Sequence, residues 1–381
     1  MILTPPALDM EIYIHIPFCV RKCKYCAFFS IADRSDLFDA YVDALCREIE
    51  LRADSGELIE TIYFGGGTPS VLSVNQLARI ISTIDRHFEI APNVELTVEA
   101  NPGTIDRKYL AELHASGVNR ISLGVQSFND RLLRSIGRIH SARQAIEIVE
   151  DAKSIFDNVS VDLICSLPHQ TPDELRQSIE QVRQLDVQHV SIYGLEVEEG
   201  TEFYRMREAG ELELPSEEDD EAMYDYVTTE LPRLGWRRYE ISNYARAGFE
   251  SRHNLGYWSD AKYLGLGAGA SSYDRLERRS NVEDVVEYIE GIRAGRDVSI
   301  PEETITRKIA IEEYCFLGLR KADGIDRKKF QKKFDTAIET IFGNVINELA
   351  SGGLIEVDNA RIKLTPRGMK FGNIVFAEFL L

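Results

Sequence analysis

The stretch HIPFCVRKCKYCAFFS at residues 15–30 places three cysteines, Cys19, Cys23 and Cys26, at the spacing C-x3-C-x2-C. It overlaps the end of EIYIHI at residues 11–16, whose alternating β-branched side chains predict a strand. Thiolates bind iron–sulfur clusters well, and a tight loop can present three of them to one cube of four irons. Three thiolates leave one iron open to the amino and carboxylate groups of a ligand. The spacing therefore predicts a 4Fe–4S site on the loop after a first strand.

A zinc site is the alternative interpretation of the same cysteines. Structural zinc normally closes with four ligands, and the candidate fourth ligand, His15, projects from the strand with poor reach. The motif context favours the cluster over zinc. The other three of the six cysteines are scattered, in apolar contexts that are typical of small core residues: Cys46, Cys165 and Cys315.

Strand and helix patterns alternate outward from this stretch to about residue 195. IETIYFGGGTP at 59–69 predicts a strand that ends in a glycine turn, and similar strands are predicted at 94–99, 119–124, 158–164 and 187–193. Apolar residues at helical spacing predict helices at 36–53, 73–88, 106–116, 141–154 and 172–185. Repeated strand–helix units predict right-handed crossovers and a parallel sheet. A full barrel of eight units needs about 250 residues, so we expect an α/β fold with a partial (β/α)6 TIM-like barrel over residues 1–200.

The pattern changes after residue 200. Helices are predicted at 198–210 and 216–235, the second with Ser216 as its N-cap and acidic residues behind it. We expect residues 201–300 to form an added α+β segment, rich in Gly, Tyr and Ser over 236–275. Helices followed by LIEVDNARIKLTPRG, with a turn at Asp358–Asn359, predict a small, mostly helical, winged-helix-like domain at 301–381.

The charge and hydropathy of the 381-residue chain bear on its partners. With 44 basic and 63 acidic residues the formal net charge is −19, which repels phosphate backbones and disfavours nucleic acid as a partner. Arg237, Arg238, Arg246 and Arg252 form a local basic cluster, which we interpret as solvated surface and not as an anion site. No run approaches the about 20 apolar residues of a membrane span, and MILTPPALDMEIYIHIPF lacks the pattern of a secretory signal, so we expect cytoplasmic residence without membrane insertion.

Further polar and glycine-rich elements fall at the ends of successive predicted strands. In FGGGTPS at 64–70, glycines allow close approach of the backbone, whose N–H groups can bind a carboxylate. Carboxylates suit an ammonium or ribose hydroxyls, and arginine suits a carboxylate. The active face of a parallel barrel gathers such strand ends, which here carry Glu99, Gln126, Arg138 and Asp162.

Together, CVRKCKYC, the lead-in Tyr13–Phe18 and the GGGTP motif resemble the signature of the radical S-adenosylmethionine superfamily, and within it the coproporphyrinogen dehydrogenase-like family. The resemblance implies that the open iron chelates S-adenosylmethionine, with Tyr25 beside the adenine. It assigns contacts with this ligand to Tyr13, Tyr25, Gly65, Gly66, Gly67, Thr68, Glu99, Gln126, Arg138 and Asp162. It identifies no catalytic residue, and whether S-adenosylmethionine is cleaved stays open.

Two activities compete within that family. One is oxygen-independent coproporphyrinogen III dehydrogenase, which decarboxylates two propionates in porphyrin biosynthesis, and the other is the HemW-type haem chaperone, which passes haem to target proteins. The dehydrogenase pattern has a further cysteine where this chain has Phe28, and a longer segment before the first strand, where ten residues precede Glu11 here. Both differences favour the chaperone.

The sequence HNLGYW at 253–258 matches the HNxxYW motif of HemW-type proteins. A neutral imidazole is a good ligand for haem iron, so we predict His253 as that ligand, with Tyr257 and Trp258 flanking the porphyrin. A satisfied core histidine is the plain alternative. A third possibility, a radical methyltransferase or a haem-degrading relative, is less favoured than the haem chaperone or the dehydrogenase. The expected partners are haem and haem-receiving proteins, which can be membrane-associated, and a homodimer is possible.

Overall fold

Period-two alternation in the first strand gives it one apolar and one polar face. The computed structural model describes residues 10–53 and 56–381, and in it β1 (Met10–Ile16) turns Ile12, Ile14 and Ile16 into a fully buried core. The alternate side chains of Glu11, Tyr13 and His15 face the opposite side of the sheet. This division between faces continues through the sheet and decides where the polar groups of the molecule gather.

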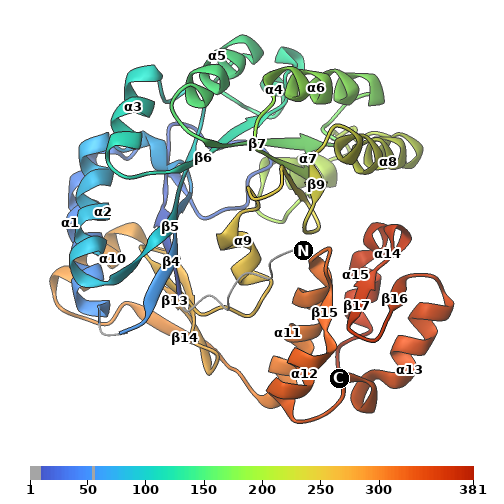
Figure 1. Ribbon diagram of the computed structural model, residues 1–381. Coiled ribbons are helices and arrows are strands. Elements are labelled where there is room, and N and C mark those ends of the chain that lie inside the picture. Colours follow the sequence, from blue (N-terminus) through green and yellow to red (C-terminus); the bar gives the residue numbers. More distant parts are fainter. Residues whose placement is uncertain (1–9, 54–55) are drawn as a thin grey trace.

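The central strands form the partial barrel that the sequence predicts. Within the described residues they belong to a 12-stranded sheet in which β1, β4, β5, β6, β7 and β8 are consecutive neighbours and pair in parallel. The bounds after β1 are β4 (Leu58–Gly66), β5 (Glu89–Ala100), β6 (Arg120–Gln126), β7 (Asn158–Cys165) and β8 (His189–Gly194). Because β8 does not return to β1, the barrel is open on one side, as Figure 1 shows.

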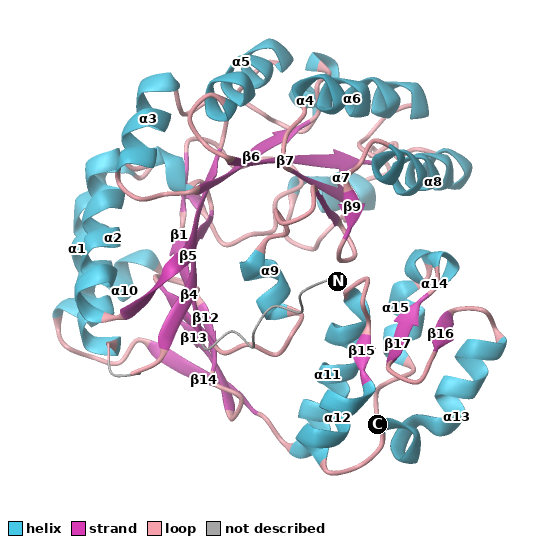
Figure 2. Cartoon of the chain, viewed as in Figure 1, coloured by secondary structure: helices cyan, strands magenta, loops and turns pink. Residues whose placement is uncertain are grey.

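Helices cover the outer face of this sheet (Figure 2). They are α1 (Phe38–Arg52), α2 (Val74–His87), α3 (Arg107–Ala115), α4 (Asp130–Ser135), α5 (Ala142–Lys153), α6 (Pro172–Leu185) and α8 (Glu217–Arg233). Helix α7 (Glu202–Glu208) instead contacts the cysteine loop, where the Phe203 N–H donates to the Lys24 carbonyl at 3.0 Å. Capping boxes begin α2, α5 and α6 at Ser73, Ser141 and Thr171, where each hydroxyl accepts a backbone N–H that the helix cannot satisfy. Ser216 caps α8 as predicted.

The chain after α8 extends both edges of the same sheet. Strands β9 (Arg237–Arg238) and β10 (Asn243–Ala245) lie on the β8 edge, with β10 antiparallel to β8. On the other edge β11 (Tyr263–Leu266) pairs in parallel with β1, followed by β12 (Ser271–Tyr273), β13 (Glu277–Asn281) and β14 (Ser299–Thr304), with α10 (Val285–Arg293) packed on α1. The sequence pattern predicts domain boundaries near residues 200 and 300. These boundaries stay a prediction, because β9 to β14 belong to the same sheet as the barrel strands.

Between the two edges the chain crosses the inside of the open barrel. There it forms the short helix α9 (Arg252–Tyr257), which lies within the arc of strands in Figure 1. Ser251 caps this helix by accepting the backbone N–H of Asn254. The HNxxYW motif is therefore placed inside the barrel.

The last part of the chain has its own apolar cluster and the winged-helix-like order of elements. Its elements are α11 (Arg307–Arg320), β15 (Ile325–Asp326), α12 (Arg327–Phe334), α13 (Ile338–Ser351), β16 (Ile355–Val357), β17 (Arg361–Leu364), α14 (Pro366–Lys370) and α15 (Gly372–Ala377). The predicted turn at Asp358–Asn359 joins β16 to β17, and Asp358 Oδ1 accepts the N–H groups of Ala360 and Arg361. In the described residues we find no helix with the length and apolarity to span a bilayer.

A buried carboxyl ties the β11–β13 edge to helix α1. Glu48 is 2% exposed and accepts hydrogen bonds from Tyr288 Oη at 2.6 Å, Asn281 Nδ2 at 2.7 Å and the Gly267 N–H at 2.8 Å. Buried polar groups are stable only when they are paired in this way. Glu48 therefore connects α1, the turn after β11, β13 and α10.

We expect Glu48→Ala to lower the free energy of unfolding by about 3 kcal/mol, because three buried donors lose their common acceptor. Denaturant titration followed by circular dichroism measures the change. As the control, Glu50→Ala on the same helix removes only the exposed ion pair with Arg47 at 2.8 Å and should cost less than about 1 kcal/mol. Equal effects of the two substitutions would contradict the role of Glu48.

Candidate functional site

Backbone hydrogen bonds fix the cysteine loop to the carboxyl ends of the barrel strands. The Gly67 N–H donates to the Ile16 carbonyl at 2.9 Å, and the Thr68 N–H donates to the Phe18 carbonyl at 2.8 Å. Within the loop region, β2 (Phe18–Cys19) pairs with β3 (Ile31–Ala32). On the far side, the Lys24 N–H donates to the Ile136 carbonyl at 3.1 Å. The loop is therefore held between β4 and the segment after α4.

The three cysteines are free, half-buried and surrounded by groups that suit an anionic cluster. Cys19 Sγ lies 3.5 Å from Thr68 Oγ1, and Arg138 Nη1 donates to Cys23 Sγ at 3.6 Å. Burial raises the pKa of the Cys26 thiol, so a bound metal has to displace its proton. Three soft donors beside a guanidinium fit an iron–sulfur cube.

The geometry disfavours zinc closed by His15. His15 Nδ1 pairs with Tyr13 Oη at 3.1 Å, and His15 Nε2 donates to the Phe29 carbonyl at 3.0 Å, so neither ring nitrogen is directed to the cysteines. In the part of the chain that the structure describes, no three His, Cys, Asp or Glu side chains converge on a single-ion site. A cube differs from zinc because each thiolate binds a different iron.

The glycine run at 65–67 is required by packing between β4 and β1. A Cβ on Gly66, which has φ +107°, would lie 2.7 Å from the His15 ring, and one on Gly67 would lie 2.7 Å from the Phe18 carbonyl oxygen. The N–H groups of Gly67 and Thr68 already bind the cysteine loop. The run positions the loop, and its role as a direct contact of S-adenosylmethionine stays a prediction.

Arg138 lies beside the cysteine loop, at the level where β6 ends. Arg138 Nη2 donates to the Gly124 carbonyl, while Arg138 Nε is buried and has no hydrogen-bond partner within the described residues. Tyr25, whose pKa is raised by burial, lies against the same guanidinium and Cys23. A buried guanidinium with a free donor is suited to binding the carboxylate of a ligand.

The two predicted carboxyls lie on the barrel's inner side. Glu99 Oε1 accepts the Tyr63 hydroxyl at 2.7 Å, and burial raises the pKa of Glu99 to about 7. Asp162 accepts the hydroxyls of Ser122 at 2.9 Å and Ser160 at 3.2 Å. Gln126, with φ +68°, ends β6. The structure thus brings Arg138 and Tyr25 to the cysteines, and holds Asp162 deeper along its strand.

His253 lies in the interior of the barrel and not at its mouth. Its side chain is 2% exposed; Nδ1 pairs with Thr61 Oγ1 at 2.7 Å and Nε2 with Tyr257 Oη at 3.2 Å. Its ring stacks on that of Tyr63 with centroids 4.9 Å apart. Burial, with Arg120 nearby, lowers the pKa of His253 to about 3, so the ring is neutral at pH 7. Direct ligation of haem by His253 stays a prediction, and it requires Nε2 to leave Tyr257.

Sequence reasoning missed the charged groups below the predicted site. Glu11 is fully buried beside His253, and neither carboxyl oxygen has a hydrogen-bond partner within residues 10–53 and 56–381. Burial, reinforced by Glu95, raises the pKa of Glu11 well above its usual range. Arg120 is also buried here. A signal for these groups is present in the sequence of residues 11–16, EIYIHI. Its polar residues alternate with isoleucines, which separates a polar face of the strand from the face that enters the core.

A cavity of about 400 Å³ opens beside the cysteine loop. Its walls come from the inner face of β1, the residues after the third cysteine, the end of α9 and the β11–β12 edge. They contribute Tyr13, His15, Phe28, Phe29, Tyr257 and Tyr263. Sites for flat organic ligands are of this size and aromatic composition.

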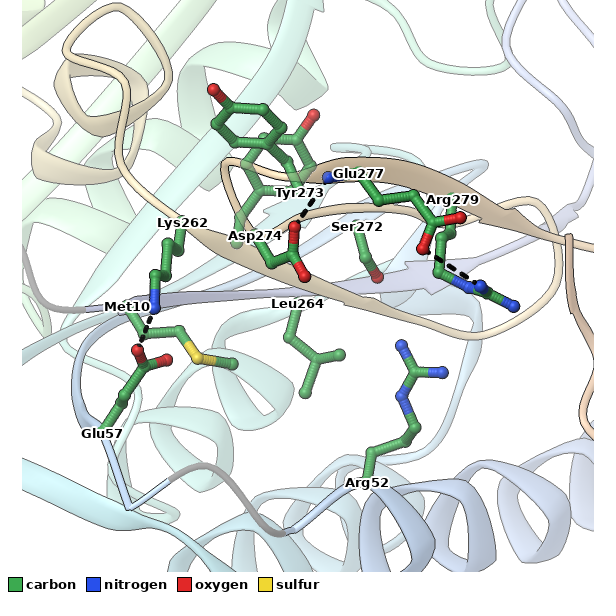
Figure 3. A pocket seen from close by; sticks show the side chains of 11 residues that line it. Met10, Arg52, Glu57, Lys262, Leu264, Ser272, Tyr273, Asp274, Glu277 and Arg279 are labelled. Carbon is green, nitrogen blue, oxygen red and sulfur yellow. Dashed lines mark hydrogen bonds and ion pairs between the residues drawn. The ribbon is translucent and has the colours of Figure 1, made fainter. Parts of the chain in front are cut away.

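A second cavity, of about 290 Å³, lies against the β11–β13 edge and contains none of the predicted site residues (Figure 3). Two ion pairs lie in its wall: Lys262 Nζ donates to Glu57, and Arg279 Nη1 lies 3.2 Å from Glu277 Oε2. Arg52 Nη1 donates instead to Ser299 Oγ at 3.4 Å, and Asp274 Oδ1 accepts the Glu277 N–H at 2.8 Å. We assign no ligand to this cavity.

Two family models match the chain. The radical SAM superfamily matches residues 13–182, which span the strands from β1 and the cysteine loop, and the HemN C-terminal domain matches residues 305–371. The first match contains all three clustered cysteines and the GGGTP motif, and the second covers most of the winged-helix-like part.

Known proteins resemble the chain over nearly its full length. It is 41% identical to a protein named heme chaperone HemW from Lactococcus lactis, over 97% of each chain, and 41% identical to one of the same name from Bacillus subtilis, over 97% of this chain and 98% of that one. The solved structure of the coproporphyrinogen III oxidase HemN from Escherichia coli has a TM-score of 0.86 at 24% identity, covering 98% of this chain and 90% of that one. This structural similarity shows the fold alone.

We expect Cys19→Ala, Cys23→Ala and Cys26→Ala each to abolish most bound iron and sulfide after anaerobic reconstitution, because the loop supplies no replacement thiolate. Iron and sulfide analysis with the visible absorption of the cluster measures the loss. Cys46→Ala is the control, since Cys46 is buried in α1 and should leave the iron content unchanged. Full iron in any of the three loop variants would contradict the site.

Proposed function

The chain belongs to the HemW family of radical SAM proteins, and we propose that it is a haem chaperone, which binds haem and delivers it to haem-receiving proteins. The observation that carries this proposal is the similarity, over nearly the whole chain, to relatives that are named heme chaperones. The HNLGYW sequence at 253–258, inside the barrel and next to an aromatic cavity, supports it.

We propose that Cys19, Cys23 and Cys26 hold a 4Fe–4S cluster. The free thiols, the guanidinium of Arg138 beside Cys23 and the anchored loop support this assignment. When bound, the cluster supplies one-electron reducing power and an open iron.

Binding of S-adenosylmethionine against the cluster is also part of the proposal. Arg138 Nε is buried and has no hydrogen-bond partner within the described residues, and Glu99 retains one carboxyl oxygen that Tyr63 does not use. We assign the remaining contacts as the sequence predicts, to Tyr13, Tyr25, Gly65, Gly66, Gly67, Thr68, Gln126 and Asp162. Since Gly67 and Thr68 use their N–H groups within the protein, their contacts would be through other atoms.

Coproporphyrinogen III dehydrogenase is the second candidate. The similar fold of HemN does not separate the two, because both activities belong to this architecture. Phe28, which stands where the dehydrogenase pattern has a further cysteine, favours the chaperone. It is 69% exposed beside the cavity, a position where an apolar ring can contact a flat ligand.

We propose cytoplasmic residence, because all six cysteines are free and a thiolate-bound cluster needs a reducing compartment. Haem-receiving proteins that are membrane-associated, and a homodimer, remain predictions.

We expect the anaerobically reconstituted protein to bind ferric haem and to transfer it to an apo-haem protein. Absorption titration measures binding, and the spectrum of the recipient after separation measures transfer. The same protein without its cluster is the control, and it shows whether haem binding and haem transfer depend on the cluster.

The same preparation, reduced and incubated with coproporphyrinogen III and S-adenosylmethionine, is expected to form no protoporphyrinogen. Formation of this product would establish the second candidate. Absence of haem binding in a fully reconstituted sample would contradict the chaperone.

A further inference from the structure

We propose that the exposed lysines of helix α12 form a docking surface for an acidic protein, and that this protein is the recipient of haem. The surface consists of Lys328, Lys329 and Lys332, and we call it the α12 lysine face. The choice of a haem recipient rests on the proposed haem chaperone function. The choice of an acidic protein rests on the charge, the exposure and the surroundings of α12.

The charge of α12 is opposite to that of the whole chain. Its sequence, RKKFQKKF, contains five basic residues and no acidic one, whereas the chain has 44 basic and 63 acidic residues. Phe330 and Phe334 are buried in the apolar cluster of the C-terminal part, so the helix presents its basic residues on its other side. A local positive field is therefore present on a protein whose net charge is −19.

The fold does not use the charges of the α12 lysine face. All three side chains are exposed, and among the described residues no ion pair involves them. The other two cations of the helix do have partners: Arg327 Nη1 donates to the Asp358 carbonyl at 2.5 Å, and Lys333 pairs with Asp260. The free charges are therefore available to a second molecule.

The spacing of these lysines is unfavourable for the helix itself. Lys332 is four positions after Lys328 and three after Lys329, so like charges are neighbours on one side of the helix. Lys328 and Lys329 also lie in the first turn, where the helix dipole favours acidic residues. Burial, together with the charges of Lys329 and Arg361, lowers the pKa of Lys321 to about 8. Cations are concentrated here against the stability of the fold, which favours a role in binding.

The α12 lysine face lies near the segment that follows α9. Lys333, the next residue of the helix, pairs with Asp260, and Lys321 Nζ donates to Ser259 Oγ at 2.9 Å. Helix α9 lies within the open barrel, and α11 and α12 are on the side of the C-terminal part that is turned toward the barrel in Figure 1. A protein bound to the face would therefore lie beside the open side of the barrel.

A nucleic acid fits this face less well than a protein. In a helix-turn-helix the second helix of the pair enters the major groove. The helix in that position is α13, whose sequence IETIFGNVINELAS contains two glutamates and no basic residue. A phosphate backbone would also extend beyond the lysine face over a strongly acidic molecule, which repels it.

An anionic lipid surface also fits less well. A helix that binds in the bilayer interface inserts apolar side chains, but Phe330 and Phe334 of α12 are only 0% and 4% exposed. A membrane is a wide anionic plane that would repel much of the acidic chain. An acidic patch of a protein can meet the lysine face alone, because salt screens charges beyond about 8 Å at physiological ionic strength.

The test uses two recipients with the same haem site, apomyoglobin and apomyoglobin with an appended run of glutamates. Fluorescence anisotropy of the labelled recipient measures its binding to the haem-loaded, reconstituted protein, and the absorption spectrum of the recipient measures transfer. We expect the wild type to bind the glutamate-tagged recipient at least about tenfold more tightly at low ionic strength. The two affinities should converge as salt is added, because salt screens the attraction.

Reversal of the three charges should remove this preference. The variant Lys328→Glu/Lys329→Glu/Lys332→Glu is expected to bind the tagged recipient at least about tenfold more weakly than the wild type does. Transfer to untagged apomyoglobin should stay within about twofold of the wild-type rate, because the variant keeps the haem site. Glutamine at the same three positions adds no new charge and should weaken binding in the same direction.

A control variant changes the net charge by the same amount on the outer helices. It combines Lys108→Glu in α3, Arg143→Glu in α5 and Arg183→Glu in α6, whose side chains are 82%, 88% and 50% exposed. Because the lysine face is intact in this variant, it should keep the preference of the wild type. Circular dichroism verifies that all variants are folded.

Equal binding of the two recipients by the wild type, or equal weakening in the lysine-face and control variants, would overturn the docking surface. Binding of a DNA duplex or of anionic phospholipid vesicles that only the lysine-face variant loses, without a preference for the tagged recipient, would assign the face to that class instead. A wild type that transfers haem to neither recipient would contradict the proposed function, whereas loss of the charge preference alone leaves that function intact.

Discussion

The pairing of β1 between β4 and β11 is the interaction on which the candidate site depends. It aligns Tyr13 with Tyr63 of β4 on one side and with Gly265 of β11 on the other. Because the strand alternates, one inner face carries Glu11 beside α9, Tyr13 and His15 in the cavity, and the cysteine loop beyond its end. A shift of register by one residue would turn this whole set outward. The same strand therefore positions the cysteine loop, the aromatic cavity and the surroundings of His253.

The interior of the barrel is polar, although the outer face of the same strands is a continuous apolar core under the helices. Arg120 is 2% exposed, and nearby Glu95 is 7% exposed. Burial opposes the charge of Arg120, but acidic neighbours, Glu95 foremost, keep its pKa raised. An unpaired buried charge would destabilise the fold. Arg120 and its acidic neighbours are therefore compatible with a stable barrel only when all of them are present. An interior of this kind is suited to binding polar and ionic ligands.

The C-terminal part contacts the chain directly after the HNxxYW helix. The Arg320 guanidinium lies 5.0 Å from the Trp258 ring centroid, Lys321 Nζ donates to Ser259 Oγ at 2.9 Å, and Lys333 pairs with Asp260. These three successive positions link the winged-helix-like part to α9. The position of α9 inside the barrel is thus set from three sides: by Glu95, which accepts the N–H groups of Arg252 at 3.0 Å and His253 at 3.2 Å, by Thr61 on His253 and by these contacts.

The sequence by itself determined the loop of three cysteines after the first strand, the six parallel strands and the winged-helix-like end, because spacing, period-two alternation and turn chemistry are local properties. The N-cap at Ser216 and the turn at Asp358 are predicted from local sequence in the same way. Only the tertiary structure decided that residues 237–304 extend both edges of the barrel sheet and that His253 lies behind Tyr257. Those outcomes depend on which edge each short strand joins and on the space inside the barrel, where Gly256 is required because a Cβ would lie 1.5 Å from Glu11 Oε1. Such long-range contacts leave no periodic signal in the chain, so a motif can name residues without showing which of them lines a cavity.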